Sequence, residues 1–427
     1  MDPGELILGA TAAIVAVLLF LVLFEPGLRY EVSAGEPVES PRFMDLIAAI
    51  INARVFDASR VAVHSSGEAI YDAEIRAIDS ARSTVHLEAY LFLRGTAGDR
   101  FLAALTEAAR RGVKVRVVVD AIGSFLTPSR YFDGLRAAGG RVAWYQPIRW
   151  YTLKRFNNRT HRELLVIDGR TGFIGGAGIA DYWLPTRGRG RPWRDTTVQV
   201  TGELVAGLQT SFIENWLESS GEILTGEDEF PYAETRPPPD EAGPVAGLVV
   251  NSTPSAGRGT RARMLFQLFL ASARKSIHIN SPYFVPDRSA RAELVRAAKR
   301  GVSVVVVTPN ELNNHPIARL ASRRRYGELL EAGVQIHEYR PTMIHAKVLV
   351  VDGLWTVLGS TNFDNRSFGL NDEVNAALRD EALAARMEVD FAADLAKSRR
   401  VTLEEWIRRP VGERVLATLG MALERQE

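Results

Sequence analysis

The most informative segment of this chain of 427 residues reads Met343-Ile-His-Ala-Lys-Val-Leu-Val-Val-Asp352 and is followed by Gly359-Ser-Thr-Asn362. Its run of β-branched residues predicts a strand, along which side chains alternate between two faces. His345 and Lys347 therefore point to the same face and offer an imidazole and an ammonium group together. Asp352 lies an odd number of residues beyond His345, so it faces the other way, at the Val-Asp-Gly turn that ends the run. We expect its carboxylate to organise this turn.

The same layout occurs earlier in the chain, in Thr160-His-Arg-Glu-Leu-Leu-Val-Ile-Asp168. His161 matches His345, and Asp168 matches Asp352. A single histidine in a strand is more often a satisfied core residue than a functional one. The second occurrence favours a functional interpretation for both histidines.

The internal repeat extends beyond these two motifs, at an offset of about 190 residues. Residues 80–88 match 272–280, and residues 108–113 match 297–302. In the first half, helix-like patterns at 69–81 and 100–111 alternate with strand-like patterns at 84–93 and 114–119, which indicates an α/β layered domain with a buried sheet. The sequence therefore predicts an α/β fold made of two similar domains.

The predicted organisation has four parts. Residues 1–30 form a membrane anchor, 31–66 a linker with an amphipathic helix, 67–235 the first α/β domain and 236–427 the second. The boundary between the domains falls in the acidic and Pro-rich stretch 222–244, which breaks the periodicity.

Composition narrows the possible functions. The 52 Lys and Arg residues balance 51 Asp and Glu residues, and a net charge of +1 gives no global attraction to nucleic acid. The absence of Cys excludes disulfides, thiolate zinc sites and cysteine nucleophiles.

Residues 6–24 contain no charged side chain and as a helix would reach about 28 Å, close to the hydrocarbon thickness of a bilayer. We favour an uncleaved anchor over a signal peptide, because Asp2 and Glu5 precede the run and no A-x-A site precedes Glu25. Arg29 follows the run and nothing basic precedes it, which predicts a single-pass protein with cytoplasmic catalytic domains.

A second apolar stripe follows the anchor at helical spacing: Phe43, Leu46, Ile47, Ile50 and Ile51. It has two interpretations. The helix could rest on the membrane surface, or it could pack on its own domain, which is the commoner use of such a stripe.

The pattern H-x-K-x4-D followed by G-S-x-N resembles the signature of the phospholipase D superfamily, and several segments resemble its bacterial cardiolipin synthase branch in particular. These segments are 157–161, 193–195, 281–286, 362–368 and 371–373. The resemblance covers most of residues 67–410. It implies a pseudo-twofold pair of α/β sandwich domains, whose two histidines meet in one site that contains no metal or cofactor.

The resemblance also implies roles for individual residues. His161 would attack phosphorus to form a phosphohistidine, and His345 would protonate the leaving alcohol and then deprotonate the incoming one. Sequence alone leaves open which histidine attacks. Lys347 would stabilise the phosphoryl oxygens. The candidates for phosphate binding are Asn362, Ser360, Arg159 and Arg194. Asp195 and Glu373 are candidates for orienting the histidines, and each could reach the histidine of the other half. The motif residues Asp168 and Asp352 complete the predicted site. Asp195 and Glu373 could equally be surface carboxylates.

Two residues depart from the family pattern. Glu163 stands where the first motif has Lys, and Gly178 where Asn is common. Two unit charges about 4 Å apart interact by about 4 kcal/mol at an effective dielectric of about 20. A negative side chain in place of a positive one beside a phosphate would therefore strongly destabilise the bound phosphate. One of the basic residues nearby could neutralise Glu163, or they could form a solvated basic loop, or they could attract anionic headgroups. They are Arg149, Lys154, Arg155, Arg159, Arg162, Arg187, Arg189, Arg191 and Arg194.

Three functions agree with these observations. The first is a phosphatidyltransferase of the bacterial inner membrane that makes cardiolipin from two phosphatidylglycerols. The second is a hydrolase of the same superfamily, a phospholipase D or a nuclease, although the anchor and the near-zero net charge argue against nucleic acid as a partner. The third, motivated by Glu163, is a lipid-binding pseudoenzyme. The sequence gives no oligomeric state.

Overall fold

The structure is a computed structural model, which describes residues 4–5, 9–13, 29–33, 35–147, 157–185, 190–231, 244–254, 259–410 and 412–413. Most of the predicted anchor at 6–24 lies outside these ranges. Within them, no helix is both long enough and apolar enough to cross a bilayer.

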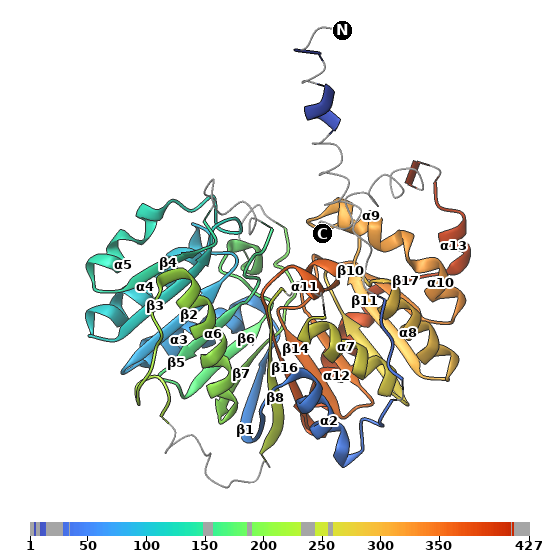
Figure 1. The fold of residues 1–427 in the computed structure, drawn as a ribbon, viewed down its shortest axis with the longest axis horizontal. Coiled ribbons are helices and arrows are strands. Elements are labelled where there is room, and N and C mark those ends of the chain that lie inside the picture. Colours follow the sequence, from blue (N-terminus) through green and yellow to red (C-terminus); the bar gives the residue numbers. More distant parts are fainter. Residues whose placement is uncertain are drawn as a thin grey trace.

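The described strands form a 15-stranded mixed sheet in which one order of strands occurs twice, outward from the centre. In the first half this order is β1 (Val55–His64), β7 (Thr197–Gly202), β6 (Thr171–Gly175), β5 (Leu164–Ile167), β2 (Thr84–Ala89), β3 (Lys114–Asp120) and β4 (Arg141–Tyr145). In the second half it is β8 (Val245–Ser252), β16 (Glu373–Arg379), β14 (Trp355–Gly359), β13 (Val348–Val351), β9 (Ser276–Asn280), β11 (Ser303–Pro309) and β12 (Gln335–Tyr339), with β17 (Ser398–Val401) added at the edge. Figure 1 shows the two halves side by side, and the predicted repeat is confirmed.

The two halves join through β1 and β8, which pair antiparallel at the centre of the sheet. The sequence had placed residues 55–64 in the linker 31–66, and this assignment is wrong. The strand pattern of β1 is interrupted by a register shift between Phe56 and Ser59, and Asp57 and Arg60 break its apolar alternation, so the segment lacks a clear strand signal. The first repeat therefore begins at β1.

Each half is a three-layered sandwich, in which both faces of the sheet are buried. Alternate residues of β5 show this: Leu164 and Val166 belong to one apolar cluster, and Leu165 and Ile167 to another. The helices of the first half are α3 (Gly67–Ser80), α4 (Thr96–Arg110), α5 (Asp133–Ala137) and α6 (Leu204–Ser220), with short 3-10 turns η1 (Ser129–Phe132) and η3 (Asp181–Trp183). Those of the second are α7 (Arg261–Ser272), α8 (Arg288–Lys299), α9 (Pro316–Arg324), α10 (Tyr326–Glu331), α11 (Asn365–Gly369), α12 (Glu381–Leu395) and α13 (Leu403–Ile407). The helices predicted at 69–81 and 100–111 are confirmed as α3 and α4.

One apolar cluster is shared by both halves. It contains residues of α6, such as Phe212, together with residues of α12, such as Phe391. The same stacking recurs in each half, since the ring of Phe212 lies 4.6 Å from that of His86, and the ring of Phe391 lies 4.7 Å from that of His278. This shared core fixes the two halves relative to each other, which a site built between them requires.

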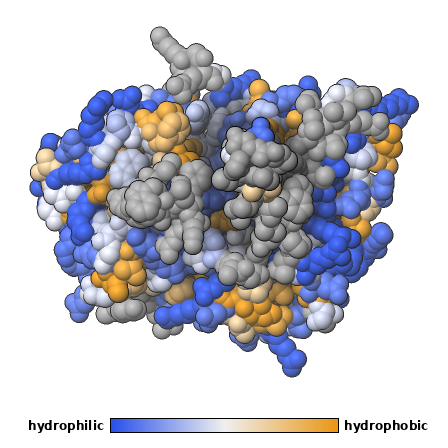
Figure 2. Space-filling view, turned by 45° about the horizontal axis from the view of Figure 1, so that its top comes forward, coloured by the Kyte–Doolittle hydropathy of each residue, from blue (hydrophilic) through white to orange (hydrophobic). Residues whose placement is uncertain are grey.

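The amphipathic stripe near the N-terminus forms helix α2 (Pro41–Ile51), whose start is capped by the Ser40 hydroxyl. Phe43 makes edge-to-face contacts with Phe269 at 5.2 Å and Trp355 at 5.5 Å. The helix therefore packs on the second half, which confirms the interpretation that its stripe serves its own domain. In Figure 1 it lies at the lower edge, opposite a short parallel pair of strands, β10 (Phe284–Val285) and β15 (Phe363–Asp364). Figure 2 looks onto the opposite, upper part, a hydrophilic surface interrupted by apolar patches.

Candidate active site

Two short backbone bridges join the halves beside the two motif histidines. Thr160 pairs with Asp372, and the His161 N–H donates to the Asp372 carbonyl at 2.9 Å. In the same way Ile344 pairs with Arg194, and the His345 N–H donates to the Arg194 carbonyl at 2.7 Å. Each bridge therefore places the histidine of one half next to the residue that follows Asp372 or Arg194 in the other half.

The residues that follow Asp372 and Arg194 carry carboxylates, Glu373 and Asp195. Nδ1 of His161 lies 3.0 Å from Oε1 of Glu373, which is fully buried. Burial raises the pKa of Glu373, but the charge and hydrogen bond of His161 outweigh it and the net pKa lies below the usual value. The Ser360 hydroxyl donates to the second oxygen of Glu373. The carboxylate is therefore ionised and holds the His161 ring at Nδ1.

His345 has the mirror arrangement, with Nδ1 at 2.9 Å from Oδ2 of the buried Asp195. Trp183 Nε1 donates to the same oxygen at 3.0 Å. Lys347 Nζ lies 2.9 Å from Nδ1 and 3.1 Å from Nε2 of the ring. Burial and the charge of Lys347 together lower the pKa of His345 to about 4, so this imidazole is neutral in the resting site. Burial also lowers the pKa of Lys347 to about 8.

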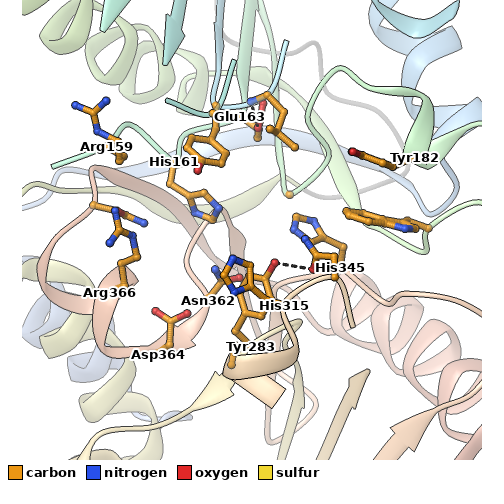
Figure 3. A pocket seen from close by; sticks show the side chains of 18 of the residues that line it. Arg159, His161, Glu163, Tyr182, Tyr283, His315, His345, Asn362, Asp364 and Arg366 are labelled. Atoms are coloured by element: carbon orange, nitrogen blue, oxygen red, sulfur yellow. Dashed lines mark hydrogen bonds between the residues drawn. The ribbon is translucent and has the colours of Figure 1, made fainter. Parts of the chain in front are cut away.

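Both histidines line one pocket of 570 Å³, and Figure 3 shows their rings approaching it from opposite sides. Asn362 lines the same pocket, and its buried amide oxygen has no hydrogen-bond partner among the described residues. Arg159 also lines the pocket, 3.6 Å from a carboxylate oxygen of Asp120. Aromatic and aliphatic side chains form much of the remaining wall: Tyr90, Leu91, Leu93, Ile122, Leu126, Tyr182, Trp183, Trp193, Tyr283, Val285 and Ala318.

Comparisons with known proteins show the family of the chain. The chain matches the family model "Cardiolipin synthase, PLD-like domain" at residues 75–182 and 268–395. It is 34% identical over 367 residues to a cardiolipin synthase of Geobacillus kaustophilus, which covers 86% of this chain and 72% of the relative. The chain belongs to the cardiolipin synthase family. The major cardiolipin synthase of Bacillus subtilis is 33% identical over 385 residues, covering 89% of this chain and 78% of the relative.

Solved structures show the same fold. A phosphatidylserine synthase of Haemophilus influenzae superimposes with a TM-score of 0.67 at 16% identity, covering 90% of this chain and 98% of that one. A polyphosphate kinase of Porphyromonas gingivalis gives a TM-score of 0.53 at 13% identity, covering 95% of this chain and 58% of that one. At these identities the likeness concerns the fold alone.

Several residues chosen from the cardiolipin synthase motifs lie where the resemblance implied. His161, His345, Asn362 and Arg159 line the pocket, and Lys347 contacts the ring of His345. The proposed orienting residues Asp195 and Glu373 each reach the histidine of the other half. They are buried, so the alternative that they are surface carboxylates is wrong.

Other candidates contact protein groups instead of the pocket. Ser360 bonds Glu373, as described above. Arg194 pairs with Asp394 at 3.1 Å and donates to the Thr196 hydroxyl at 2.8 Å. Neither residue lines the pocket, and the contacts of Arg194 fit a role in fixing the bridge beside His345.

The motif aspartates organise turns, as the sequence analysis of Asp352 suggested. Asp168 and Asp352 both have left-handed backbone conformations, with φ of 53° and 55°. The Asp168 carboxylate accepts from the N–H groups of residues 82–84, and that of Asp352 from residues 274–276. Despite burial, these bonds lower the pKa of Asp168. Each carboxylate ties the end of a strand to the start of the adjacent one.

Glu163 lines the pocket, where one carboxyl oxygen accepts from the Leu91 N–H at 3.4 Å. Burial raises its pKa well above the usual value, although this bond and the charge of Lys347 oppose the shift. A Cβ atom at Gly178 would come within 2.8 Å of the Glu163 carboxyl and 2.9 Å of Leu91 Cβ. The two departures from the family pattern are therefore coupled, since the glycine makes room for the carboxyl.

Two of the basic residues considered as partners of Glu163 pair with other carboxylates. Arg162 points away and bonds Glu214 at 3.0 Å, and Arg194 bonds Asp394. Five other basic candidates, Arg149, Lys154, Arg155, Arg187 and Arg189, lie outside the described residues. Burial favours the uncharged, protonated form of Glu163.

Some pocket residues were missed by sequence reasoning. Asp364 and Arg366 belong to the segment 362–368 that resembles the family, so their position was a usable signal. Tyr90 and His315 also line the pocket, but nothing in their local sequence separates them from ordinary strand and loop residues. Among the described residues, no group of three or more His, Asp or Glu side chains could hold a metal ion.

Proposed function

We propose that the protein transfers a phosphatidyl group from one phosphatidylglycerol to the glycerol hydroxyl of a second, which forms cardiolipin and releases glycerol. The observation that carries the proposal is the pair of histidines, each held at Nδ1 by a buried carboxylate of the other half and both lining one pocket. Membership of the cardiolipin synthase family and the apolar pocket wall support a lipid substrate.

In the first step, Nε2 of His161 attacks phosphorus and the bond to the glycerol headgroup breaks. Two observations support His161 as the nucleophile. Glu373 holds the proton on Nδ1, which leaves the lone pair on Nε2. Within the described chain nothing hydrogen-bonds this Nε2, whereas Lys347 lies 3.1 Å from Nε2 of His345. The product is a phosphatidyl group bound covalently to His161.

His345 serves as the acid and then the base. It gives a proton to the leaving glycerol oxygen and then removes one from the hydroxyl of the second phosphatidylglycerol, whose oxygen attacks phosphorus and frees His161. Burial and Lys347 lower the pKa of His345 to about 4, and the negative charge of a bound phosphodiester would raise it. His345 therefore takes up a proton from solvent when the substrate binds, and this is the proton that it gives to the leaving oxygen. Asp195 stabilises the imidazolium once it forms, as a buried carboxylate does in other catalytic triads.

Lys347, Asn362 and Arg159 stabilise the negative charge that develops on the phosphoryl oxygens. The ammonium and guanidinium groups supply positive charge, and the amide supplies a hydrogen bond. A protonated Glu163 at the pocket wall adds no opposing charge, which argues against a pseudoenzyme.

A phospholipase D reaction is the second candidate, because water could replace the second lipid as acceptor. The apolar side chains around the pocket limit water near the phosphohistidine and so favour transfer.

We further propose that residues 6–24 anchor the protein in the inner membrane as a single-pass protein with its catalytic domains in the cytoplasm. Carbonate-washed membranes should retain the full chain and release one that lacks residues 1–25, and release of both would exclude the anchor.

The deciding experiment for the function uses purified protein and phosphatidylglycerol vesicles, with lipids and glycerol measured by mass spectrometry. Cardiolipin with equimolar glycerol is expected. Phosphatidic acid without cardiolipin would establish a hydrolase instead, and the absence of any product would support a lipid-binding protein. A His345→Ala variant serves as the inactive control.

A further inference from the structure

Four large apolar side chains are exposed on two segments that border the pocket. Phe125 and Leu126 are 69% and 64% exposed, and Leu312 and Ile317 are 53% and 39% exposed. We call these four the mouth residues. Leu126 itself lines the pocket, as do Asn314 and His315, which lie between Leu312 and Ile317 in the chain.

The two segments occupy equivalent positions in the repeat. One follows β3 and the other follows β11, strands that hold the same place in the order of each half. The mouth residues therefore flank one pocket from both halves of the molecule. Equivalent exposure on both sides is unexpected for scattered surface hydrophobics, which occur singly.

The first segment is held rigidly although its apolar side chains face solvent. The buried Ser124 hydroxyl donates to the Tyr90 carbonyl at 2.9 Å and accepts from the Phe92 N–H at 2.8 Å. The buried Thr127 hydroxyl donates to the Phe92 carbonyl at 2.7 Å. Phe125 and Leu126 lie between these two fixed points, so the fold presents them outward.

The second segment is fixed by asparagine side chains. The buried Asn313 amide donates to the Pro282 carbonyl at 3.2 Å and its oxygen accepts from the His315 N–H at 2.7 Å. The Asn310 side chain accepts from the Leu312 N–H at 2.9 Å. A different set of bonds thus produces the same outward presentation in the second half.

We propose that the mouth residues insert into the interfacial region of an anionic lipid bilayer and so turn the pocket mouth toward the membrane. The proposal rests on the proposed function, since a substrate with two acyl chains reaches a pocket most directly when its mouth meets the bilayer. The charge nearby fits this occupant, because two exposed arginines supply positive groups that attract anionic headgroups. Arg130 follows the first segment closely in sequence, and Arg94 lies two residues after Phe92, whose backbone bonds Ser124 and Thr127.

A cysteine-free chain allows a direct test in the full-length protein. Phe125→Cys and Leu312→Cys are each labelled with an environment-sensitive NBD fluorophore and mixed with phosphatidylglycerol vesicles. Ile50→Cys, on the exposed side of α2 and 42% exposed, is the matched control for attachment through the anchor alone. A severalfold rise and a blue shift of the emission are expected at 125 and 312 but not at 50.

Equal responses at all three positions, or none at 125 and 312, would overturn the proposal. A rise that needs no vesicles and grows with protein concentration would overturn it in favour of a second copy of the chain. Because the labels report contact without turnover, they remain informative even where the protein makes no cardiolipin.

A second variant connects docking to activity. Phe125→Glu with Leu312→Glu changes neither a histidine nor a pocket-lining residue. We expect it to lower cardiolipin formation on vesicles by about tenfold, through lost apolar burial, and to leave formation in mixed detergent micelles unchanged. Equal loss in both, or no loss on vesicles, would count against docking through the mouth residues.

Discussion

The Glu163→Gln variant tests whether the carboxyl at the position of the family lysine is protonated. Protonation would explain why the pocket tolerates a carboxyl there. Glutamine keeps the shape of the side chain, stays neutral at every pH and can still accept from the Leu91 N–H. Because burial raises the pKa of Glu163, we expect the wild-type side chain to be uncharged at neutral pH. The substitution should therefore change kcat/KM very little.

The size of the opposite result follows from electrostatics. An ionised carboxylate about 5 Å from a phosphate opposes it by about 3 kcal/mol at an effective dielectric of about 20. Removing that charge would raise kcat/KM by about 200-fold. A protonated Glu163 predicts a change of less than about threefold, which is clearly separable from such a rise.

The assay measures initial rates of cardiolipin formation on phosphatidylglycerol vesicles between pH 6 and 8. Glu68→Gln, an exposed acid at the start of α3, controls for a general change in surface charge. A rise near 200-fold would refute protonation of Glu163. A fall beyond tenfold would instead give the carboxyl proton a role of its own in the reaction.

The other predictions concern positioning and stability. Asp195→Asn should lower kcat by about 10²- to 10⁴-fold with little change in KM, because the His345 ring loses its orienting carboxylate; a loss confined to KM or to thermal stability would contradict this. Asp168→Asn should cost about 1–3 kcal/mol of unfolding free energy in denaturant titrations, because its charge-assisted backbone bonds weaken, while the folded fraction keeps its specific activity. Burial raises the pKa of Glu74 to about 8, so its contribution to stability is complete below about pH 4.5 and is lost as pH rises toward 8, at about 1.4 kcal/mol per unit. Glu74→Gln should therefore raise the melting temperature at pH 8 relative to the wild type and less so at pH 5; an equal effect at both would show that Glu74 is not protonated by folding.

The duplicated motif made the architecture predictable. Two histidines at the same place in two similar halves led to a pseudo-twofold fold, and the strand order recurs in both halves. The cross-pairing of Asp195 and Glu373 could be suggested from the motifs, but its geometry depends on the bridges at Thr160 and Ile344. Such bridges are contacts between halves and leave no local pattern in the sequence.

Two further features could not be predicted from the sequence, because both depend on contacts between distant residues. The strand β1 carries charged residues and a register shift, so its place at the centre of the sheet becomes evident only from its partners β7 and β8. The consequence of Glu163 depended on depth within the fold. From the sequence it was a charge beside a phosphate, whereas the structure buries its carboxyl in the space left by Gly178, where burial favours the uncharged form.

The central claim is that one histidine from each half acts on a single phosphodiester, with His161 as nucleophile and His345 as acid and base. It is tested most directly with phosphatidyl-p-nitrophenol, whose leaving group needs no acid. His345→Ala should release a burst of p-nitrophenolate equal to the enzyme concentration and accumulate a phosphatidyl adduct on the peptide that contains His161, while His161→Ala gives neither. A burst from His161→Ala with an adduct at His345 would reverse the roles, and steady turnover by either variant without an adduct would contradict the shared covalent mechanism.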